Sequence, residues 1–303
     1  EYLLEPVVLN MSDTLFRMAG ERQDERMQAV AIATQLDYYY FQGTNEDSVI
    51  HYTNKVKEFA KATHQPKYYY FAWANRLITY YLKTSRTNIA LYEVQNMLKE
   101  AQEEDDKTGL SRCYNIMSQI YTIKRFDSMA FEWRLKEIEL TEKYKIENYN
   151  ISQTYAQIAN YYINQKKQKE ALAAVEKAIA TANSSTQQIS AKLEFVNYYS
   201  KFGDFQAAEK LLKECQTAFE QDKRLESIKK RLYNIECLYY QQTKQYPKAL
   251  EAAKMQEKEE RRLSESILSS IHYRTQGEIY QKMGNMNLAV KYLQMYINAD
   301  DSL

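Results

Sequence analysis

Residues 273–296 have the sequence YRTQGEIYQKMGNMNLAVKYLQMY. Three apolar or small residues fall at i, i+4 and i+7 and therefore share one helix face: Tyr273, Gly277 and Tyr280. Gly284 is typical of a helix end, and Asn285 is typical of the start of the next helix. The second helix carries an inner apolar stripe made of Leu288, Ala289, Tyr292, Leu293 and Tyr296. The stretch predicts two helices joined by a tight turn.

The same arrangement recurs along the chain at intervals of 37 to 41 residues. A small residue follows the turn at seven positions: Val49, Ala90, Ala130, Ala171, Ala208, Ala249 and Ala289. A tyrosine lies nine residues before each of them: Tyr40, Tyr81, Tyr121, Tyr162, Tyr199, Tyr240 and Tyr280. Such self-similarity at a fixed period indicates a repeat array.

The composition agrees with a helical array. The chain has 6 glycines and 3 prolines, where average usage would give about 21 and about 15. Sheets and tight hairpins need these residues at their turns, so their scarcity argues against an all-β fold and against a glycine-rich phosphate loop. The 303 residues lie near the size at which single cores stop growing. In an array each repeat packs only against its neighbours, so no global core is required.

Residues that would indicate catalysis or metal binding are scarce. The histidines are His51, His64 and His272, and the cysteines are Cys113, Cys215 and Cys237. None of the histidines has a second histidine or a cysteine four residues away, and there is no CxxC pair. The sequence has no GxSxG, P-loop or kinase signature. We therefore expect no catalytic residue, metal or cofactor, and no enzymatic activity in this chain, although a kinase domain could lie elsewhere in a full-length protein.

The charges also limit the classes of partner. The 41 basic and 40 acidic residues nearly balance, so no nucleic-acid contact is expected from this region. Residues 257–262, EKEERR, have the pattern of a solvated helix face with i, i+4 pairs. The paired tyrosines could form an aromatic platform for a ligand, but their fixed phase favours packing between repeats.

The repeat resembles the tetratricopeptide repeat (TPR) over residues 24–303. That family places a bulky residue, a small residue, a tyrosine, an alanine and a large apolar residue at the spacings found here. The last repeat matches it in Tyr273, Gly277, Tyr280, Ala289 and Leu293, and the fourth in Tyr155, Ala159, Tyr162, Ala171, Val175 and Ala178. The third repeat departs from it at Ser118 and Arg134, and the first at Asp37.

The resemblance implies an all-α fold, a right-handed α-α superhelix or solenoid of about seven helix pairs. The usual period is about 34 residues, and the seven extra residues add about one turn to each helix, which preserves the facing stripes. The repeats are expected at residues 24–66, 67–107, 108–147, 148–184, 185–223, 224–263 and 264–303. Residues 1–23 are expected to form an N-terminal capping helix or the remnant of an earlier repeat.

In the TPR family the first helix of each pair lines a concave groove that binds a protein or peptide. We transferred these groove positions, together with positions one helical turn earlier on the same face, to this chain. They give eight candidate ligand-binding residues: Asn75, Arg112, Asn115, Gln119, Asn160, Asn197, Arg231 and Asn234. An asparagine amide can clamp a peptide backbone, and an arginine can hold a carboxylate with two hydrogen bonds. The alternative is that these are ordinary polar surface residues.

The last residues, AVKYLQMYINADDSL at 289–303, carry a second resemblance. They are similar to the end of the TPR sensor region in bacterial membrane-anchored histidine kinases and helix-turn-helix regulators, through Tyr292, Tyr296, Ile297, Asp301, Ser302 and Leu303. This resemblance implies a periplasmic or other extracytoplasmic sensor of a two-component type, anchored by a membrane span outside this chain and able to form a homodimer. The alternatives are a cytoplasmic peptide-binding regulator of the quorum-sensing type and a passive TPR scaffold.

Overall fold

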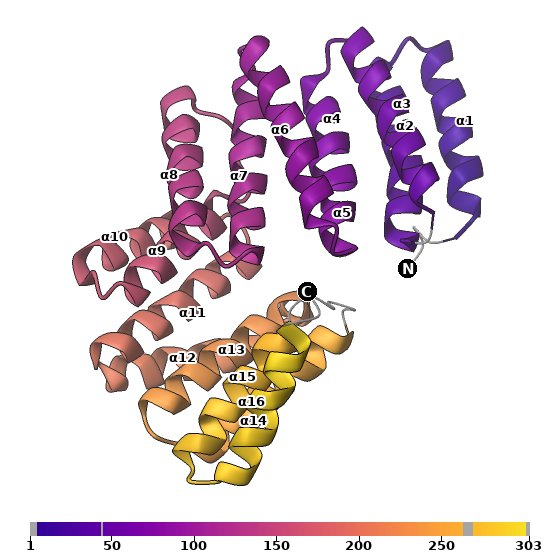
Figure 1. Ribbon diagram of the computed structural model, residues 1–303. Helices are drawn as coiled ribbons and strands as arrows, with labels where there is room; N and C mark the ends of the chain where they lie inside the picture. Colours follow the sequence, from indigo (N-terminus) through magenta and orange to yellow (C-terminus); the bar gives the residue numbers. More distant parts are fainter. Residues whose placement is uncertain (1–4, 44, 263–268, 301–303) are drawn as a thin grey trace. The chain divides into compact units, whose positions relative to one another are not determined.

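The structure is a computed structural model that describes residues 5–43, 45–262 and 269–300 (Figure 1). Within these ranges the regular structure consists of helices, without a β-strand. The all-α fold class, with about seven helix pairs, is therefore confirmed. The chain divides into two compact units, Glu1–Glu147 and Asn148–Leu303, and each is described by itself.

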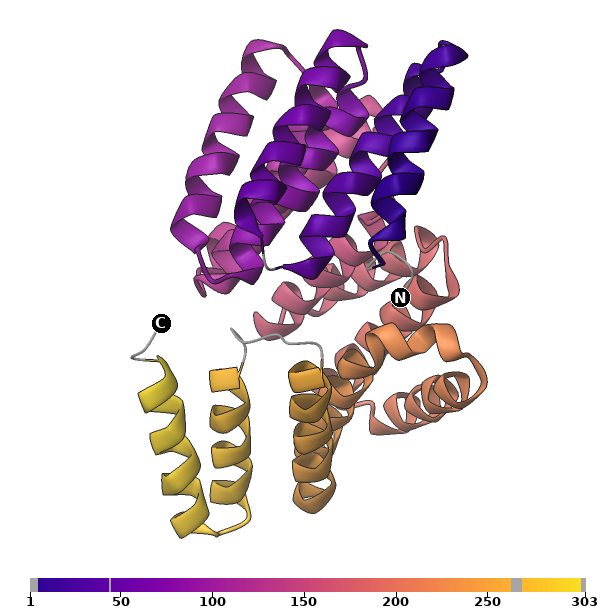
Figure 2. The same cartoon turned by 90° about the vertical axis from the view of Figure 1, so that its right-hand side faces the viewer.

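The first unit begins with one helix and continues with helix pairs whose members pack against each other (Figures 1 and 2). Its elements are α1 (Val7–Glu21), α2 (Glu25–Gln42), α3 (Glu46–Ala62), α4 (Pro66–Tyr70), the π-helix η2 (Phe71–Ile78), α5 (Thr79–Lys83), α6 (Thr87–Glu103), α7 (Lys107–Ile123) and α8 (Asp127–Tyr144). The segments α4, η2 and α5 follow one another without a break, so they form the first helix of the second pair.

The second unit consists of further helix pairs and a short 3-10 helix. Its elements are α9 (Ile151–Asn164), α10 (Gln168–Ala180), α11 (Ser185–Phe202), α12 (Phe205–Gln221), the 3-10 helix η3 (Lys223–Ile228), α13 (Lys229–Gln242), α14 (Tyr246–Arg262), α15 (Ser269–Lys282) and α16 (Met286–Asp300). Each first helix packs on its own second helix, and α11 also packs on both α9 and α13. The first helices α9, α11 and α13 are therefore in direct contact in succession.

The turns are fixed by the residues expected to cap helices. Gly43 and Gly203 end α2 and α11 with positive φ angles of 68° and 89°, a conformation that favours glycine. The side chains of Asn45 and Asp204 accept hydrogen bonds from the backbone N–H groups of Ser48 and Ala207, and so cap α3 and α12.

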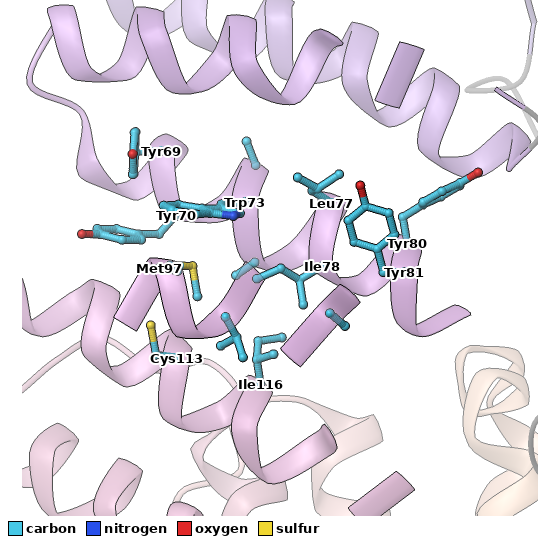
Figure 3. Close-up of a cluster of buried hydrophobic side chains, with 14 of the residues drawn as sticks. Tyr69, Tyr70, Trp73, Leu77, Ile78, Tyr80, Tyr81, Met97, Cys113 and Ile116 are labelled. Atoms are coloured by element: carbon cyan, nitrogen blue, oxygen red, sulfur yellow. The ribbon is translucent and has the colours of Figure 1, made fainter. Parts of the chain in front are cut away.

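The repeated small residues form the centre of the packing. All seven of them, Val49, Ala90, Ala130, Ala171, Ala208, Ala249 and Ala289, are at most 3% exposed. Two glycines allow even closer contact, since a Cβ added at Gly109 would lie 2.3 Å from the Tyr70 ring and one at Gly277 would lie 2.9 Å from Leu293. In the first unit Tyr70, Trp73, Ile78, Met97 and Cys113 belong to one buried cluster (Figure 3).

The polar residues that stand where the repeat pattern has small or apolar residues have partners inside the fold. Asp37, at a small-residue position, accepts a hydrogen bond from Arg76 Nε of the next pair at 2.5 Å. The Arg76 guanidinium also lies over the Phe71 ring, 4.4 Å from its centre. Arg134, at an apolar position, is buried and donates to Thr122 Oγ1 at 2.6 Å. Burial of these charged groups is tolerated because each has a hydrogen-bonding partner.

The prediction of a solvated face at residues 257–262 was wrong for two residues. Glu259 and Glu260 are buried in α14. Glu260 contacts His272 of α15 and lies 3.7 Å from Lys230 Nζ of α13. The local alternation of charge could not reveal this, because both partners come from other helices.

Candidate ligand-binding face

The eight candidate residues all lie on first helices of pairs. Asn75 is in η2; Arg112, Asn115 and Gln119 are in α7; Asn160 is in α9; Asn197 is in α11; and Arg231 and Asn234 are in α13. We call this set the first-helix face, with one part in each unit. The structure connects some of its members directly and leaves others separate.

In the first unit, Arg112 and Asn75 are joined across two pairs. Arg112 Nη1 donates to Asn75 Oδ1 at 2.6 Å, and both residues are half-buried. Asn75 lies in the π-helix, where Thr79 Oγ1 bonds the carbonyl of Ala74, five residues earlier. The π-helix is eight residues long, and Asn75 within it accepts the hydrogen bond from Arg112 of α7. The sequence reasoning missed the π-helix, for which residues 71–78 give no recognised signal.

Arg112 has no carboxylate partner within 4.0 Å in the described part of the chain. Its Nε is buried and has no acceptor among the described residues. Burial also lowers the pKa of the guanidinium, and no neighbouring negative charge opposes this effect. Arg112 therefore carries a positive charge that the fold does not neutralise.

Asn115 and Gln119 form a separate polar group one turn further along α7. Asn115 Nδ2 lies 3.2 Å from both carboxylate oxygens of Glu137, which is buried in α8. Gln119 Nε2 donates to Asn115 Oδ1 at 2.7 Å, and Gln119 is exposed. Both ends of the Asn115 amide are therefore occupied, while the Gln119 carbonyl is accessible. Glu137 was not among the candidates, because its contact with α7 depends on tertiary packing.

In the second unit, Arg231 is already paired. Its Nη2 donates to Glu194 Oε1 at 2.6 Å, and the Glu194 side chain is 3% exposed. Asn197 Nδ2 lies 3.4 Å from the other oxygen of Glu194, and Asn197 is itself buried. The three residues form a closed group, in which the carboxylate expected at Arg231 comes from the protein itself. Glu194 is thus a further residue that the sequence analysis did not select.

Asn160 and Asn234 retain hydrogen-bonding capacity. Asn160 Oδ1 accepts from Asn164 Nδ2 at 3.1 Å, which leaves its own amide N–H groups for other acceptors. Asn234 is half-buried, and its side chain makes no hydrogen bond to the residues that the structure describes. These two amides are the groups of the face in the second unit that keep unused donors.

The paired tyrosines are packing residues. Tyr80, Tyr198 and Tyr239 are buried, and the members of each pair meet edge to face, with ring centres 6.1, 5.5 and 5.4 Å apart for the three pairs that contain them. Such edge-to-face contacts are a favourable arrangement of packed aromatic rings and stabilise helix packing.

The described residues contain no cluster of three or more His, Cys, Asp or Glu side chains that could hold a metal ion. No helix among them is both long and apolar enough to cross a membrane.

Comparison with known proteins shows which solved structures have a similar fold. No family model matches the chain, and no curated protein sequence matches it. Among solved structures, Rap protein complexed with competence and sporulation factor aligns over 98% of this chain and 97% of that one, with a TM-score of 0.57 and 14% identity. NprR in complex with its cognate peptide NprX aligns over 88% and 78%, with a TM-score of 0.60 and 13% identity.

A tetratricopeptide repeat protein from Parabacteroides merdae aligns over 96% of this chain and 93% of that one, with a TM-score of 0.51 and 13% identity. At this level of identity the similarity concerns the fold. The fold of this chain is TPR-like, as the repeat pattern predicts.

Proposed function

We propose that this chain is a non-catalytic binding module that holds an extended peptide, or a peptide segment of a partner protein, along its first-helix face. The observation that carries the proposal is that first helices within each unit carry half-buried amide and guanidinium groups, several with unused donors. Arg112 in the first unit and Asn160 and Asn234 in the second are the clearest cases. Groups of this kind can form hydrogen bonds with a peptide backbone whatever side chains the peptide carries.

The structural neighbours support the same class of ligand. Rap protein was solved with competence and sporulation factor, and NprR with its cognate peptide NprX. Both align with most of this chain, so a similar arrangement of helix pairs carries a bound peptide in NprR and a bound factor in Rap protein. A fold alone does not fix a function, and the proposal therefore rests on the polar residues together with the fold.

For the cellular role, we propose the sensor part of a bacterial signal-transduction regulator. The similarity of residues 289–303 to membrane-anchored regulators supports an extracytoplasmic sensor; Tyr292, Tyr296 and Ile297 lie in α16, whereas residues 301–303 lie outside the described residues. The alignment with the quorum sensor NprR from B. thuringiensis supports the second candidate, a cytoplasmic peptide receptor. Protease accessibility of the tagged full-length protein in intact and opened cells separates the two.

The binding proposal is tested with a synthetic mixture of hexapeptides and the full 303-residue chain. Peptides retained by the wild type are identified by mass spectrometry and titrated individually. The double variant Asn160→Ala, Asn234→Ala should weaken binding about tenfold or more, since each lost hydrogen bond costs about 1 kcal/mol. Asn54→Ala is the matched control, because Asn54 is exposed on the second helix α3. Retention of no peptide, or equal affinity in all three proteins, would contradict the proposal.

A further inference from the structure

In the second unit, the first helices of the pairs run in the same direction. Gln187 Nε2, near the start of α11, donates to the carbonyl of Tyr149, just before α9, at 2.6 Å. Ser185, the first residue of α11, donates through Oγ to Asp222, just before η3 and α13, at 3.4 Å. The starts of these helices therefore lie together, and α11 packs on both α9 and α13. Their C-terminal ends must lie along the opposite edge of the unit.

The C-terminal ends of α13 and α15 are also joined, because Lys282 Nζ donates to Gln241 Oε1 at 3.4 Å. The turns to the second helices follow at this edge, in residues 162–171, 199–208, 240–249 and 280–289. These four stretches contain only two acidic residues, Glu170 and Asp204. They contain seven lysines, which we call the basic edge: Lys166, Lys167, Lys169, Lys201, Lys244, Lys248 and Lys282. All seven are exposed, and none forms an ion pair with a described residue.

The stability of the helices does not explain these lysines. Lys166 and Lys244 have positive φ angles of 57° and 59°, at the turn position that glycine occupies at 203 and 284. A residue with a Cβ is disfavoured in that conformation. Lys169 and Lys248 lie in the first turns of α10 and α14, where a cation opposes the helix dipole. Several of the charges therefore stand where they cost stability.

The repeat itself does not require the lysines either. The equivalent stretches of the first unit are residues 40–49, 81–90 and 121–130. They contain four basic and three acidic residues. The excess of positive charge is therefore a property of the second unit.

Exposed apolar side chains accompany the lysines at two of the turns. Phe205 follows the turn after Lys201 and is 40% exposed. Met283 and Met286 flank the turn after Lys282 and are 42% and 57% exposed. Phe205 and Met286 occupy the same position of their repeats, as the first residue of a second helix. Lysines next to exposed apolar side chains are the combination found on proteins that bind the surface of a membrane.

We propose that the basic edge of the second unit binds an anionic lipid surface. Each lysine near such a surface raises the affinity about fivefold. Phe205, Met283 and Met286 enter the apolar boundary below the lipid headgroups, where their burial is favourable. A nucleic acid or an acidic protein offers negative charge as well, but no apolar layer for these side chains. The residues differ from those of the first-helix face, so this binding is independent of peptide binding.

The experiment is sedimentation of the full 303-residue chain with lipid vesicles. The chain should sediment with vesicles of phosphatidylcholine and phosphatidylglycerol in equal amounts, but not with vesicles of phosphatidylcholine alone. High salt should release it, because salt screens exposed charges. The double variant Lys166→Glu, Lys244→Glu should lower the partition coefficient at least about twentyfold.

The matched control is Lys223→Glu, Lys258→Glu, which makes the same change in net charge at two other exposed lysines. Lys258 lies ten residues beyond Lys248 in α14, or about 15 Å along the helix. This exceeds the screening length of about 8 Å at physiological salt. The control should therefore bind within about threefold of the wild type. All these residues are exposed, so every variant should melt at the wild-type temperature.

A second pair of variants distinguishes lipid from other anionic partners. Phe205→Ser, Met286→Ser should weaken vesicle binding about tenfold or more, because two apolar side chains no longer enter the membrane. Its retention on heparin, a soluble polyanion, should not change. Ile179→Ser is the control, because Ile179 is 37% exposed near the far end of α10.

Four results would overturn the inference. They are no binding to the anionic vesicles, equal binding to neutral vesicles, equal losses in the edge variant and its lysine control, and full vesicle binding by Phe205→Ser, Met286→Ser. The last result would indicate a purely electrostatic partner, such as a nucleic acid or an acidic protein. None of these results bears on the hexapeptide measurements, so the two proposals can fail separately.

Discussion

The ring of Tyr70 lies against the backbone of Gly109, so closely that a Cβ at Gly109 would be 2.3 Å from the ring carbon Cζ. Tyr70 is 1% exposed and belongs to the main cluster of the first unit (Figure 3). Glycine at position 109 is thus a packing requirement of the contact between α4 and α7, although its backbone is helical.

Gly109→Ala should therefore destabilise the first unit by about 1–3 kcal/mol, the usual cost of overpacking. Both tryptophans, Trp73 and Trp133, lie in that unit, so urea unfolding followed by tryptophan fluorescence reports on it. Gly20→Ala is the control: its Cβ would meet only the end of the Gln28 side chain, and alanine favours a helix by about 0.5–1 kcal/mol. Equal stability of Gly109→Ala and the wild type would contradict this account.

The contact between Asp37 and Arg76 should couple the first two helix pairs. Its side chains are only 22% and 15% exposed, so solvent screens the ion pair weakly. Asp37→Asn and Arg76→Gln should each destabilise the first unit, and a double-mutant cycle should give a coupling of about 1–3 kcal/mol. A coupling near zero would mean that Arg76 acts only through its contacts with aromatic rings.

The closed group around Glu194 should stabilise the packing of α11 on α13. Glu194→Gln leaves Arg231 half-buried without its charge partner, so amide protection in α13 should fall about tenfold to a hundredfold. Hydrogen exchange measured by mass spectrometry resolves this helix. Glu226→Gln is the control, because its ion pair with Lys229 is exposed and such pairs contribute little. The prediction fails if both variants exchange like the wild type.

Buried thiols should make the protein sensitive to alkali. Burial raises the pKa of Cys113 to about 12, and those of Cys215 and Cys237 to about 11. In the unfolded chain cysteine has a pKa of about 8.5, so above that pH the unfolded state loses protons that the native state keeps. The free energy of unfolding is therefore not reduced by these thiols below about pH 8.5. Between about pH 8.5 and 11 it falls by up to about 1.4 kcal/mol per pH unit for each thiol.

Urea midpoints measured across this range provide the test. Cys113→Ala should reduce the slope with pH, even though the variant is less stable at neutral pH. At neutral pH the native thiols should react with a thiol reagent only as fast as the protein opens, because their sulfur atoms are buried. Rapid labelling of the folded protein would show that the cysteines are accessible.

The repeat and its packing were predictable because they depend on local periodicity. Ala90 and Tyr81 are separated by a fixed interval that recurs along the chain, and both are buried as the pattern requires. A stripe at helical spacing must face a neighbour, so the helix pairs follow from the sequence alone.

The partners of individual side chains were not predictable. Glu194 meets Arg231 only because two helices of different repeats pack in one register, and no local pattern encodes that register. The π-helix at Phe71–Ile78 was not predictable either, since its residues give no recognised local signal. Glutamate is usually found on the surface, yet Glu260 is buried and contacts Lys230 and His272.

The equal spacing of the Asn75–Arg112 and Glu194–Arg231 pairs has an evolutionary consequence. A glutamate at position 75 would reproduce in the first unit the internal neutralisation that the second unit already has, and glutamine at position 194 would do the reverse. The charge carried by the first-helix face can therefore change by exchanges at one position per repeat, without any alteration to the helices that carry them.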